Sequence, residues 1–402
     1  MRPISLICLM CLGINLALTC YANFPALQPE FEIMWDLSKM ESGLIFGIFF
    51  GGVLAGTPLL SPLADKYDPR RVWMVSVTLM ALSTFGFAFL ARGFWSALSF
   101  RGLTGFGLSG VYMPGLKILS DRLKGPIQTR ATVFYTASFI IGFSVSFAMT
   151  GEIAEAFGWQ WAFITAGIAL AIAALLVLPI SPAEKHHLRE EDTHAMDFRP
   201  TLRAHPAMAF ITAYGAHCWE AFTLGSWCVA VLTYHLSVFE PDLNPSFNPI
   251  WVASITGLMG FPASVTGNEL CLRFGRRRVI FFISAVSAFF TMIFGFLLWL
   301  PYWLLVLMSF FMVFMISLDS GSLSAGMIQR APRGYIAATM AIYSMAGFGA
   351  GLVGPFVFGA VLDLFGDKNI IGWGFAYASV GLAALVAPLA MRYMGLKNDT
   401  GP

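Results

Sequence analysis

Two long uncharged runs are joined by the stretch Gly56-Thr57-Pro58-Leu59-Leu60-Ser61-Pro62-Leu63-Ala64-Asp65-Lys66-Tyr67-Asp68-Pro69-Arg70-Arg71-Val72. The runs are residues 42–64 and 72–91, and neither contains an acidic residue, a lysine or an arginine. A helix of about 20 residues rises about 1.5 Å per residue and can cross a hydrocarbon core of roughly 30 Å. The stretch is therefore predicted to be a short charged turn at the water surface between two membrane helices.

A weaker copy of this turn lies in the second half of the chain, again between apolar runs: Leu272-Arg273-Phe274-Gly275-Arg276-Arg277-Arg278-Val279. Two further pairs correspond between the halves. Gly158-Trp159 and Gly372-Trp373 each open an apolar run, and Tyr135-Thr136 corresponds to Tyr343-Ser344. Similar segments half a chain apart indicate an internal duplication.

The composition indicates that lipid surrounds most of the chain. Of its 402 residues, 57% are hydrophobic and only 11% are charged, against about 25% charged in soluble domains. Long continuous apolar runs are typical of membrane helices, whereas membrane barrels show short alternating segments. We expect twelve spans, at residues 3–26, 40–63, 72–91, 95–119, 131–151, 159–180, 207–235, 248–270, 278–298, 303–327, 335–361 and 373–393.

This pattern predicts an all-α membrane protein with twelve transmembrane helices in two six-helix bundles. Because six is an even number, both bundles run in the same sense, as in transporters built from parallel repeats. The expected domains are a bundle at 1–180, a linker at 181–206 and a bundle at 207–402. The linker contains several histidines beside acidic residues, and we interpret it as a solvated connection in preference to a metal site.

The distribution of basic residues orients the chain. With both termini inside, every lysine and arginine falls in an inner segment except Lys39, Arg92, Arg101 and Lys368. This asymmetry obeys the positive-inside rule. We therefore expect both termini and the linker to be cytoplasmic, in the inner membrane of a bacterium. The uncharged run at 3–29 is too long for the core of a signal peptide, so it is interpreted as the first helix.

The charged turn and the twelve spans resemble the major facilitator superfamily. The first signature of that family is Gly-x-x-x-Asp-Arg-x-Gly-Arg-Arg between helices two and three. Asp65, Lys66, Arg70 and Arg71 occupy its charged positions here, while Ser61 and Asp68 replace its glycines. The second copy keeps Arg273, Gly275, Arg276 and Arg277 but has Leu272 in place of the acid.

Helix four carries a second family signature, an arginine followed by glycines at the fourth and sixth positions: Arg101, Gly105 and Gly107. The glycine-proline signature of antiporters is missing from residues 142–151. The resemblance also implies an inner gate, with Asp65 facing Gly334-Tyr335 and with Arg70 or Arg71 facing Asp121. The expected gating residues are Asp65, Lys66, Arg70, Arg71, Asp121, Arg273, Arg276 and Arg277.

Polar residues inside membrane spans are costly and usually face a cavity. Spans one, four, seven and ten each carry a polar stripe, and the resemblance implies that these four helices line the central cavity. The candidate substrate and proton residues are Asn15, Arg101, Tyr112, His217, Glu220 and Asp319. Structural roles remain open for them: Glu220 as a partner of Arg101, Asp319 as a partner of Arg330, and His217 as a core histidine.

We found no nucleotide-binding glycine loop and no combination of nucleophile, base and metal ligands. The function expected is a secondary active transporter, not an enzyme. It would move a small organic solute, including an anionic one, by alternating access with proton-coupled uptake. We expect a monomer in the bilayer, with no cofactor, no metal and no nucleic acid partner. The alternatives are drug or metabolite efflux by proton antiport, and a non-transporting membrane sensor on the same scaffold.

The orientation can be tested by labelling a cysteine placed in the linker by Glu190→Cys, in a background without other cysteines. We expect an impermeant thiol reagent to label this position only after the membrane is permeabilised. Labelling from outside in intact cells would contradict the orientation.

Overall fold

The computed structural model describes residues 2–182 and 197–393, without the side chains of Ser61, Asp65 and Ala337. These residues form helices and connecting turns, with no strand among them. The helices of the first half are α1 (Pro3–Leu18), α2 (Asn23–Trp35), α3 (Lys39–Lys66), α4 (Pro69–Leu90), α5 (Phe94–Leu108), α6 (Tyr112–Ser120), α7 (Pro126–Phe157) and α8 (Trp159–Leu176).

The second half contains more helices, because several of its spans are interrupted. They are α9 (Arg199–Arg203), α10 (His205–Val238), α11 (Pro249–Leu258), α12 (Gly260–Phe274), α13 (Arg276–Phe294), the short 3-10 helix η1 (Gly295–Leu297), α14 (Tyr302–Ser317), α15 (Ser320–Arg330), α16 (Ile336–Phe365), α17 (Ile370–Ala384) and α18 (Val386–Tyr393). Helix α9 lies in the expected linker, whose residues 183–196 lie outside the described part of the chain.

Eleven stretches of the described chain are long and apolar enough to cross a membrane. They correspond to all the expected spans but the fourth, 95–119. That span is present as two shorter helices, α5 and α6, separated at 109–111. Gly110 lies in the interruption, and a Cβ there would collide with Ser76 Oγ on α4. The chain is bent where α4 passes too close for a side chain.

Four other spans are interrupted as well. Residues 19–22 separate α1 from α2, Met259 separates α11 from α12, Leu318 and Asp319 separate α14 from α15, and Leu385 separates α17 from α18. An interruption leaves backbone carbonyl and amide groups without their helical partners in the middle of a span. In transporters built from repeats, such interruptions often form binding sites.

The chain forms two compact units. The first comprises Met1–Leu37, Leu44–Leu188 and Ser246–Leu258, and the second comprises Ser38–Gly43, Arg189–Pro245 and Met259–Pro402. Relative to the expected halves 1–180 and 207–402, Ser246–Leu258 groups with the first unit and Ser38–Gly43 with the second. The halves themselves stay a prediction.

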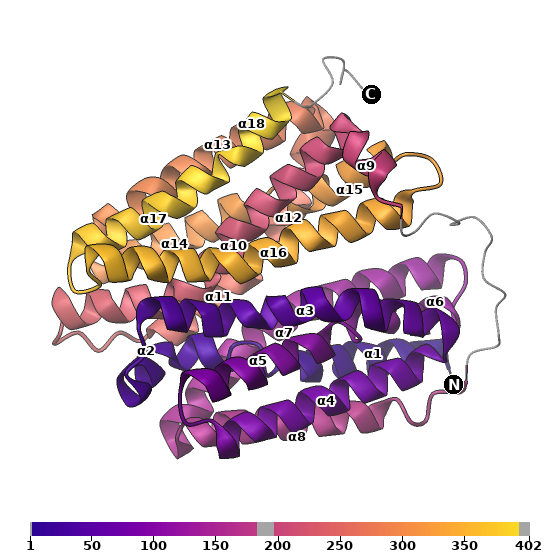
Figure 1. Cartoon of the computed structure of the whole chain (residues 1–402), viewed down its shortest axis with the longest axis horizontal. Coiled ribbons are helices and arrows are strands. Elements are labelled where there is room, and N and C mark those ends of the chain that lie inside the picture. Colours follow the sequence, from indigo (N-terminus) through magenta and orange to yellow (C-terminus); the bar gives the residue numbers. More distant parts are fainter. Residues whose placement is uncertain (1, 183–196, 394–402) are drawn as a thin grey trace. The chain divides into compact units, whose positions relative to one another are not determined.

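In the first unit, α4 packs against α5 and α8, and α1 packs against α7 (Figure 1). Stacked aromatic rings fill this unit, among them Phe87 and Phe163 with their centroids 4.1 Å apart. Helix α11 groups with this unit because it packs along α7. Ser254 Oγ donates to the carbonyl of Ser144 at 2.7 Å, and Trp251 Nε1 donates to Glu152 Oε1 at 2.8 Å.

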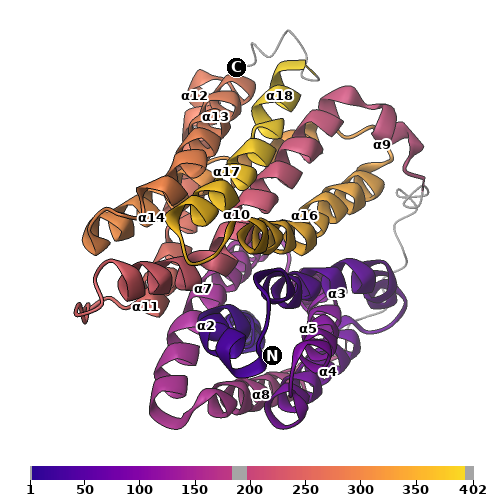
Figure 2. The same ribbon diagram turned by 60° about the vertical axis from the view of Figure 1, so that its left-hand side comes forward.

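In the second unit, α10 packs against α16 and against α15, α17 and α18, and α13 packs against α17 and α18 (Figure 2). The first turn of α3 groups with this unit through α16. The carboxylate of Asp363 accepts the amide hydrogens of Lys39 at 3.0 Å and Met40 at 2.8 Å. An acid at a helix N-terminus satisfies free amides and offsets the positive end of the helix dipole.

A buried histidine fixes one end of α10. His235 is fully buried, with Nδ1 2.8 Å from the carbonyl oxygen of Leu298 and Nε2 3.3 Å from Glu240 Oε1. The same oxygen of Glu240 accepts the amide hydrogen of Tyr302 at 2.7 Å. These contacts tie α10 to the turn before α14, where Pro301 precedes the helix.

Replacement of His235 should lower the thermal stability of the second unit. His235→Ala leaves the buried carbonyl of Leu298 without its partner, which costs about 1–3 kcal/mol. We expect a lower thermal midpoint for the purified protein in detergent, measured by fluorescence of the native tryptophans. The control is His205→Ala at the exposed start of α10, which should change the midpoint little. Equal midpoints for the two variants would contradict the role of His235.

Candidate functional site

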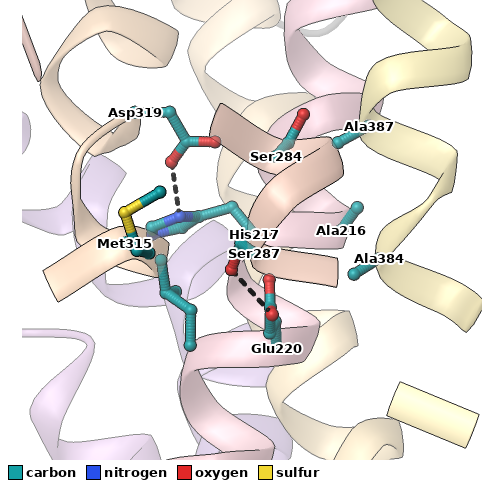
Figure 3. A pocket seen from close by; sticks show the side chains of 10 residues that line it. Ala216, His217, Glu220, Ser284, Ser287, Met315, Asp319, Ala384 and Ala387 are labelled. Carbon is teal, nitrogen blue, oxygen red and sulfur yellow. Dashed lines mark hydrogen bonds and ion pairs between the residues drawn. The ribbon is translucent and has the colours of Figure 1, made fainter. Parts of the chain in front are cut away.

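Three ionisable residues meet inside the second unit, in a void lined by α10, α13, α14, α17 and α18 (Figure 3). Glu220 and His217 lie on α10, and Asp319 lies in the interruption between α14 and α15. Glu220 and Asp319 are only 4% and 3% exposed. The sequence pattern had placed these residues on two different spans, and the structure brings them to one site.

The contacts inside the cluster are short. His217 Nδ1 lies 2.8 Å from Asp319 Oδ1, an ion-pair distance, although no hydrogen bond reaches that oxygen from the described residues. Glu220 Oε1 accepts hydrogen bonds from Ser287 Oγ at 2.9 Å and Thr291 Oγ1 at 2.5 Å. Each carboxylate therefore has its own polar partner within an apolar bundle.

The surroundings of Asp319 and His217 bear on the structural roles left open for them. Asp319 pairs with His217, whereas the guanidinium of Arg330 lies over the ring of Phe210, 5.3 Å from its centroid. His217 is also stacked beside Tyr214, with ring centroids 6.0 Å apart. His217 is thus packed like a core residue and is also the partner of a carboxylate.

The hydroxyl residues of α13 were not among the predicted site residues. Ser284, Ser287 and Thr291 lie three and four residues apart in an otherwise apolar helix, so they share one face. Their spacing is a sequence signal of the same kind as the polar stripes of spans one, four, seven and ten.

Arg101 has a different environment, inside the first unit. Its Nη1 donates to the carbonyl oxygen of Cys20 at 3.0 Å, and its Nη2 donates to that of Tyr21 at 3.1 Å. Both carbonyls belong to the interruption between α1 and α2. The guanidinium carbon also lies 4.6 Å from the centroid of the Phe49 ring. Arg101 therefore stabilises the interruption, and its expected role toward an anionic solute stays a prediction.

Asn15 and Tyr112 make modest contacts within the first unit. Asn15 Nδ2 donates to the carbonyl of Cys11 in its own helix at 2.9 Å. The hydroxyl of Tyr112 lies 3.2 Å from Thr136 Oγ1, and its ring is 4.9 Å from that of Phe139. Both side chains are only partly buried. Their role in a solute site stays a prediction.

The charged turn between α3 and α4 is held by Asp68. This residue caps α4 by accepting the amide hydrogen of Arg70 at 3.0 Å, and it also accepts from Arg70 Nε at 2.8 Å. Arg122 Nη2 lies 3.7 Å from the same carboxylate. We expected Asp121 as the partner of Arg70 or Arg71, but the described contacts of Arg70 go to Asp68 and to the carbonyl of Ile180.

The other expected gating residues differ in their surroundings. Lys66 and Arg71 are exposed, Asp121 follows the last residue of α6, and the side chain of Asp65 lies outside the described part of the structure. The expected contact of Asp65 with Gly334 and Tyr335 therefore stays a prediction.

In the second copy of the turn, Arg277 binds the end of α18. Its Nε donates to the carbonyl of Met391 at 2.7 Å, and its Nη2 donates to that of Arg392 at 2.8 Å. Arg276 donates to Gln329 Oε1 at 2.5 Å, and Arg273 forms an exposed pair with Glu269 at 2.9 Å. Arginines at helix C-termini satisfy free carbonyls and offset the negative end of the helix dipole.

The comparison with known families gives a match over most of the chain. The family model described as Major Facilitator Superfamily matches residues 6–355. The chain belongs to the Major Facilitator Superfamily. The expected fold class, an all-α membrane protein with the fold of this family, is thereby confirmed, and the protein is an integral, multi-pass membrane protein.

The chain is also similar to known transporters and to solved structures of transporters. The chain is 28% identical over 134 residues to the niacin transporter NiaP of Acinetobacter baylyi, which covers 33% of this chain and 30% of the relative. It is 25% identical over 163 residues to a probable sphingolipid transporter, spinster homolog 1, of Arabidopsis thaliana, covering 40% and 31%. The chain thus matches about a third of the length of these relatives.

Among solved structures, a D-xylose-proton symporter superposes with a TM-score of 0.80 at 15% identity, covering 98% of both chains. The nucleoside transporter NupG superposes with a TM-score of 0.75 at 15% identity, covering 98% of this chain and 99% of that one. At such identities the likeness shows the fold alone. The proteins named are transporters and not enzymes.

The charged turn of this chain departs from the family signature at Asp68, which stands where the signature has glycine. Burial by itself would raise the pKa of Asp68. The hydrogen bonds from Arg70, with the charges of Arg70 and Arg122, outweigh burial and hold the pKa below its ordinary value of 3.8. The stabilisation from this carboxylate is therefore complete above the ordinary value and is lost as the pH falls through the lower, folded value.

The lowered pKa of Asp68 predicts how the stability of Asp68→Asn should depend on pH. The variant should have a lower thermal midpoint than the wild type at neutral pH, and the difference should shrink as the pH falls below 3.8. Thermal unfolding in detergent at a series of pH values measures it. Asp242→Asn in an exposed loop is the control and should match the wild type. A difference between Asp68→Asn and wild type that is independent of pH would contradict the ion-pair account.

Proposed function

We propose that this protein is a secondary active transporter that takes a small organic solute into the cell together with protons. The observation that carries the proposal is the buried cluster of Glu220, His217 and Asp319 in the second unit. The family match supports transport, and the cluster supports the proton as the coupling ion.

The net charge of the cluster favours proton binding. Two carboxylates share a water-poor interior with one imidazole, so a fully ionised cluster would carry a net negative charge. An uncompensated charge in such an interior is very costly. Binding of a proton to a carboxylate removes this cost, and loss of the proton restores it. The free energy of the cluster therefore depends on its proton occupancy, as coupling requires.

The size of the void separates the proton site from the solute site. Its volume is about 10 Å³. A cavity of about 10–15 Å³ holds one water molecule, whereas pockets for drug-sized ligands run to about 300 Å³ or more. The cluster can hold a proton or a water molecule but not an organic solute, which must bind elsewhere. No metal-binding group of three His, Cys, Asp or Glu side chains occurs within residues 2–182 and 197–393.

The elements that carry the cluster can transmit its protonation state. Helix α10 is continuous from His205 to Val238, so Glu220 and His217 move with the whole helix. Asp319 lies in an interruption, where backbone hydrogen bonds are fewer and rearrangement costs less. A change in the pairing of Asp319 with His217 would therefore alter how α10 packs against α14 and α15.

The solute class is proposed from chemistry and from relatives together. NiaP is named for niacin, and a relative in Acinetobacter baylyi, PcaK, is named for 4-hydroxybenzoate. Both named solutes are small organic molecules with a carboxyl group. We propose a solute of this size, and uptake as the direction because the antiporter signature is absent. A thermal-shift panel of nicotinate, 4-hydroxybenzoate, nucleosides and D-xylose would choose the solute, because bound ligands stabilise the folded state.

The test of coupling is Glu220→Gln, which keeps the size of the side chain but cannot bind or release a proton. We expect the variant in proteoliposomes to bind and exchange the panel solute but to lose accumulation driven by a pH gradient. Asp242→Asn, in an exposed loop, is the control and should accumulate solute normally.

If Glu220→Gln still accumulates solute, and collapse of the pH gradient stops that accumulation, the proton site lies elsewhere and Asp319 is the next candidate. If the wild type accumulates solute equally well without any pH gradient, proton coupling itself is wrong.

A further inference from the structure

Two hydroxyl groups of α13 converge on one oxygen of Glu220. Ser287 Oγ and Thr291 Oγ1 both donate to Oε1, at 2.9 and 2.5 Å. Ser287 is 2% exposed and Thr291 is fully buried. The other carboxyl oxygen, Oε2, receives no hydrogen bond from the described part of the chain and is the free position for a proton.

The hydroxyls of Ser287 and Thr291 are directed away from their own helix, toward a carboxylate. Buried serines and threonines in helices usually donate to a carbonyl three or four residues earlier in the same helix. Ser284, one turn before Ser287, does so, with Oγ 2.6 Å from the carbonyl oxygen of Ile280. Thr84 on α4 does the same toward Met80 at 2.8 Å. Ser287 and Thr291 instead donate to a carboxylate on another helix.

We propose that Ser287 and Thr291 are positioning residues that set the pH at which Glu220 binds its proton. This inference deepens the proposed function and rests on it for its biological meaning. A hydroxyl that donates to a carboxylate stabilises the charged form and so opposes protonation. The two hydroxyls thus counteract the burial of Glu220 and keep its proton exchangeable.

The other groups around Glu220 do not donate a hydrogen bond to its carboxylate. His217 comes from α10 and is paired with Asp319 at the interruption before α15. The residues that α17 and α18 contribute to the void are Ala384 and Ala387, which cannot donate or titrate. Ser284 lines the same void, but its hydroxyl is engaged within α13. Among the described residues, only Ser287 and Thr291 donate to Glu220.

The test uses proton binding itself, so that no solute is required. Infrared difference spectra of the full-length protein, recorded over a pH series, report the carboxyl band that Glu220→Gln abolishes. Thr291→Val keeps the shape of the side chain and removes the hydroxyl, and Ser287→Ala removes the other donor. We expect each change to move the midpoint of this band to higher pH by about one unit, the usual effect of one hydrogen bond to a charged group.

Two matched variants separate positioning from packing. Ser284→Ala removes a hydroxyl from the same helix and the same void but not from Glu220, so its midpoint should equal that of the wild type. Thr291→Ser keeps the hydroxyl and loses only a methyl group, and it should also keep the wild-type midpoint. If Thr291→Val does not fold, Ser287→Ala carries the same test.

An unshifted midpoint in Thr291→Val or Ser287→Ala, or an equal shift in Ser284→Ala, would overturn the inference. The proposed function fails differently: solute accumulation by the wild type would not respond to a pH gradient, whatever the infrared midpoints of the variants. The two failures are therefore read from separate measurements.

Discussion

The structure depends on one constraint: a carboxylate inside a helix bundle must bind a proton, find a cation or accept hydrogen bonds. Glu220 is buried on α10, and the elements around it meet this requirement. Helix α13 provides two hydroxyl donors, and α10 provides His217. The interruption before α15 provides a second carboxylate, that of Asp319, which pairs with the imidazole of His217. Small alanines of α17 and α18 leave a void of one water molecule.

The two units show how a duplicated scaffold can diverge. Each has an interruption in an equivalent span, α5–α6 in the first and α14–α15 in the second. In the first unit the interruption is closed by packing, since Tyr135 donates to the carbonyl of Val111 and Gly110 lies against Ser76. In the second unit the interruption carries Asp319. The duplicated structural features, such as Arg70 and Arg277 at helix ends, are retained, whereas the ionisable cluster belongs to the second unit.

Much of the fold could be predicted from the sequence because hydropathy and basic residues report directly on membrane spans. The repeat was indicated by the two charged turns, and in the second turn Arg277 donates to backbone carbonyls at the end of α18. Interruptions were not predicted, because residues 19–22 and 109–111 contain neither a charged residue nor a proline. Without them, the carbonyl partners of Arg101 could not be foreseen.

The candidate site was predicted in part. The stripe on span seven and the acid on span ten identified Glu220, His217 and Asp319, but which acid pairs with His217 depends on how helices pack. Asp121 was expected as the partner of Arg70 or Arg71. The described side-chain partner of Arg70 is Asp68, which caps α4 only two residues away. The hydroxyls of α13 were missed because serine and threonine are common in membrane helices and usually bind their own backbone.

The most direct test of the account measures protons while the solute moves. A solute gradient is imposed on weakly buffered proteoliposomes, with no pH gradient, and the internal pH is followed with a trapped dye. The account predicts that solute entry acidifies the interior with the wild type, and that Glu220→Gln lets the solute enter by exchange without acidification. Solute entry without acidification in the wild type, or unchanged acidification with Glu220→Gln, would contradict it.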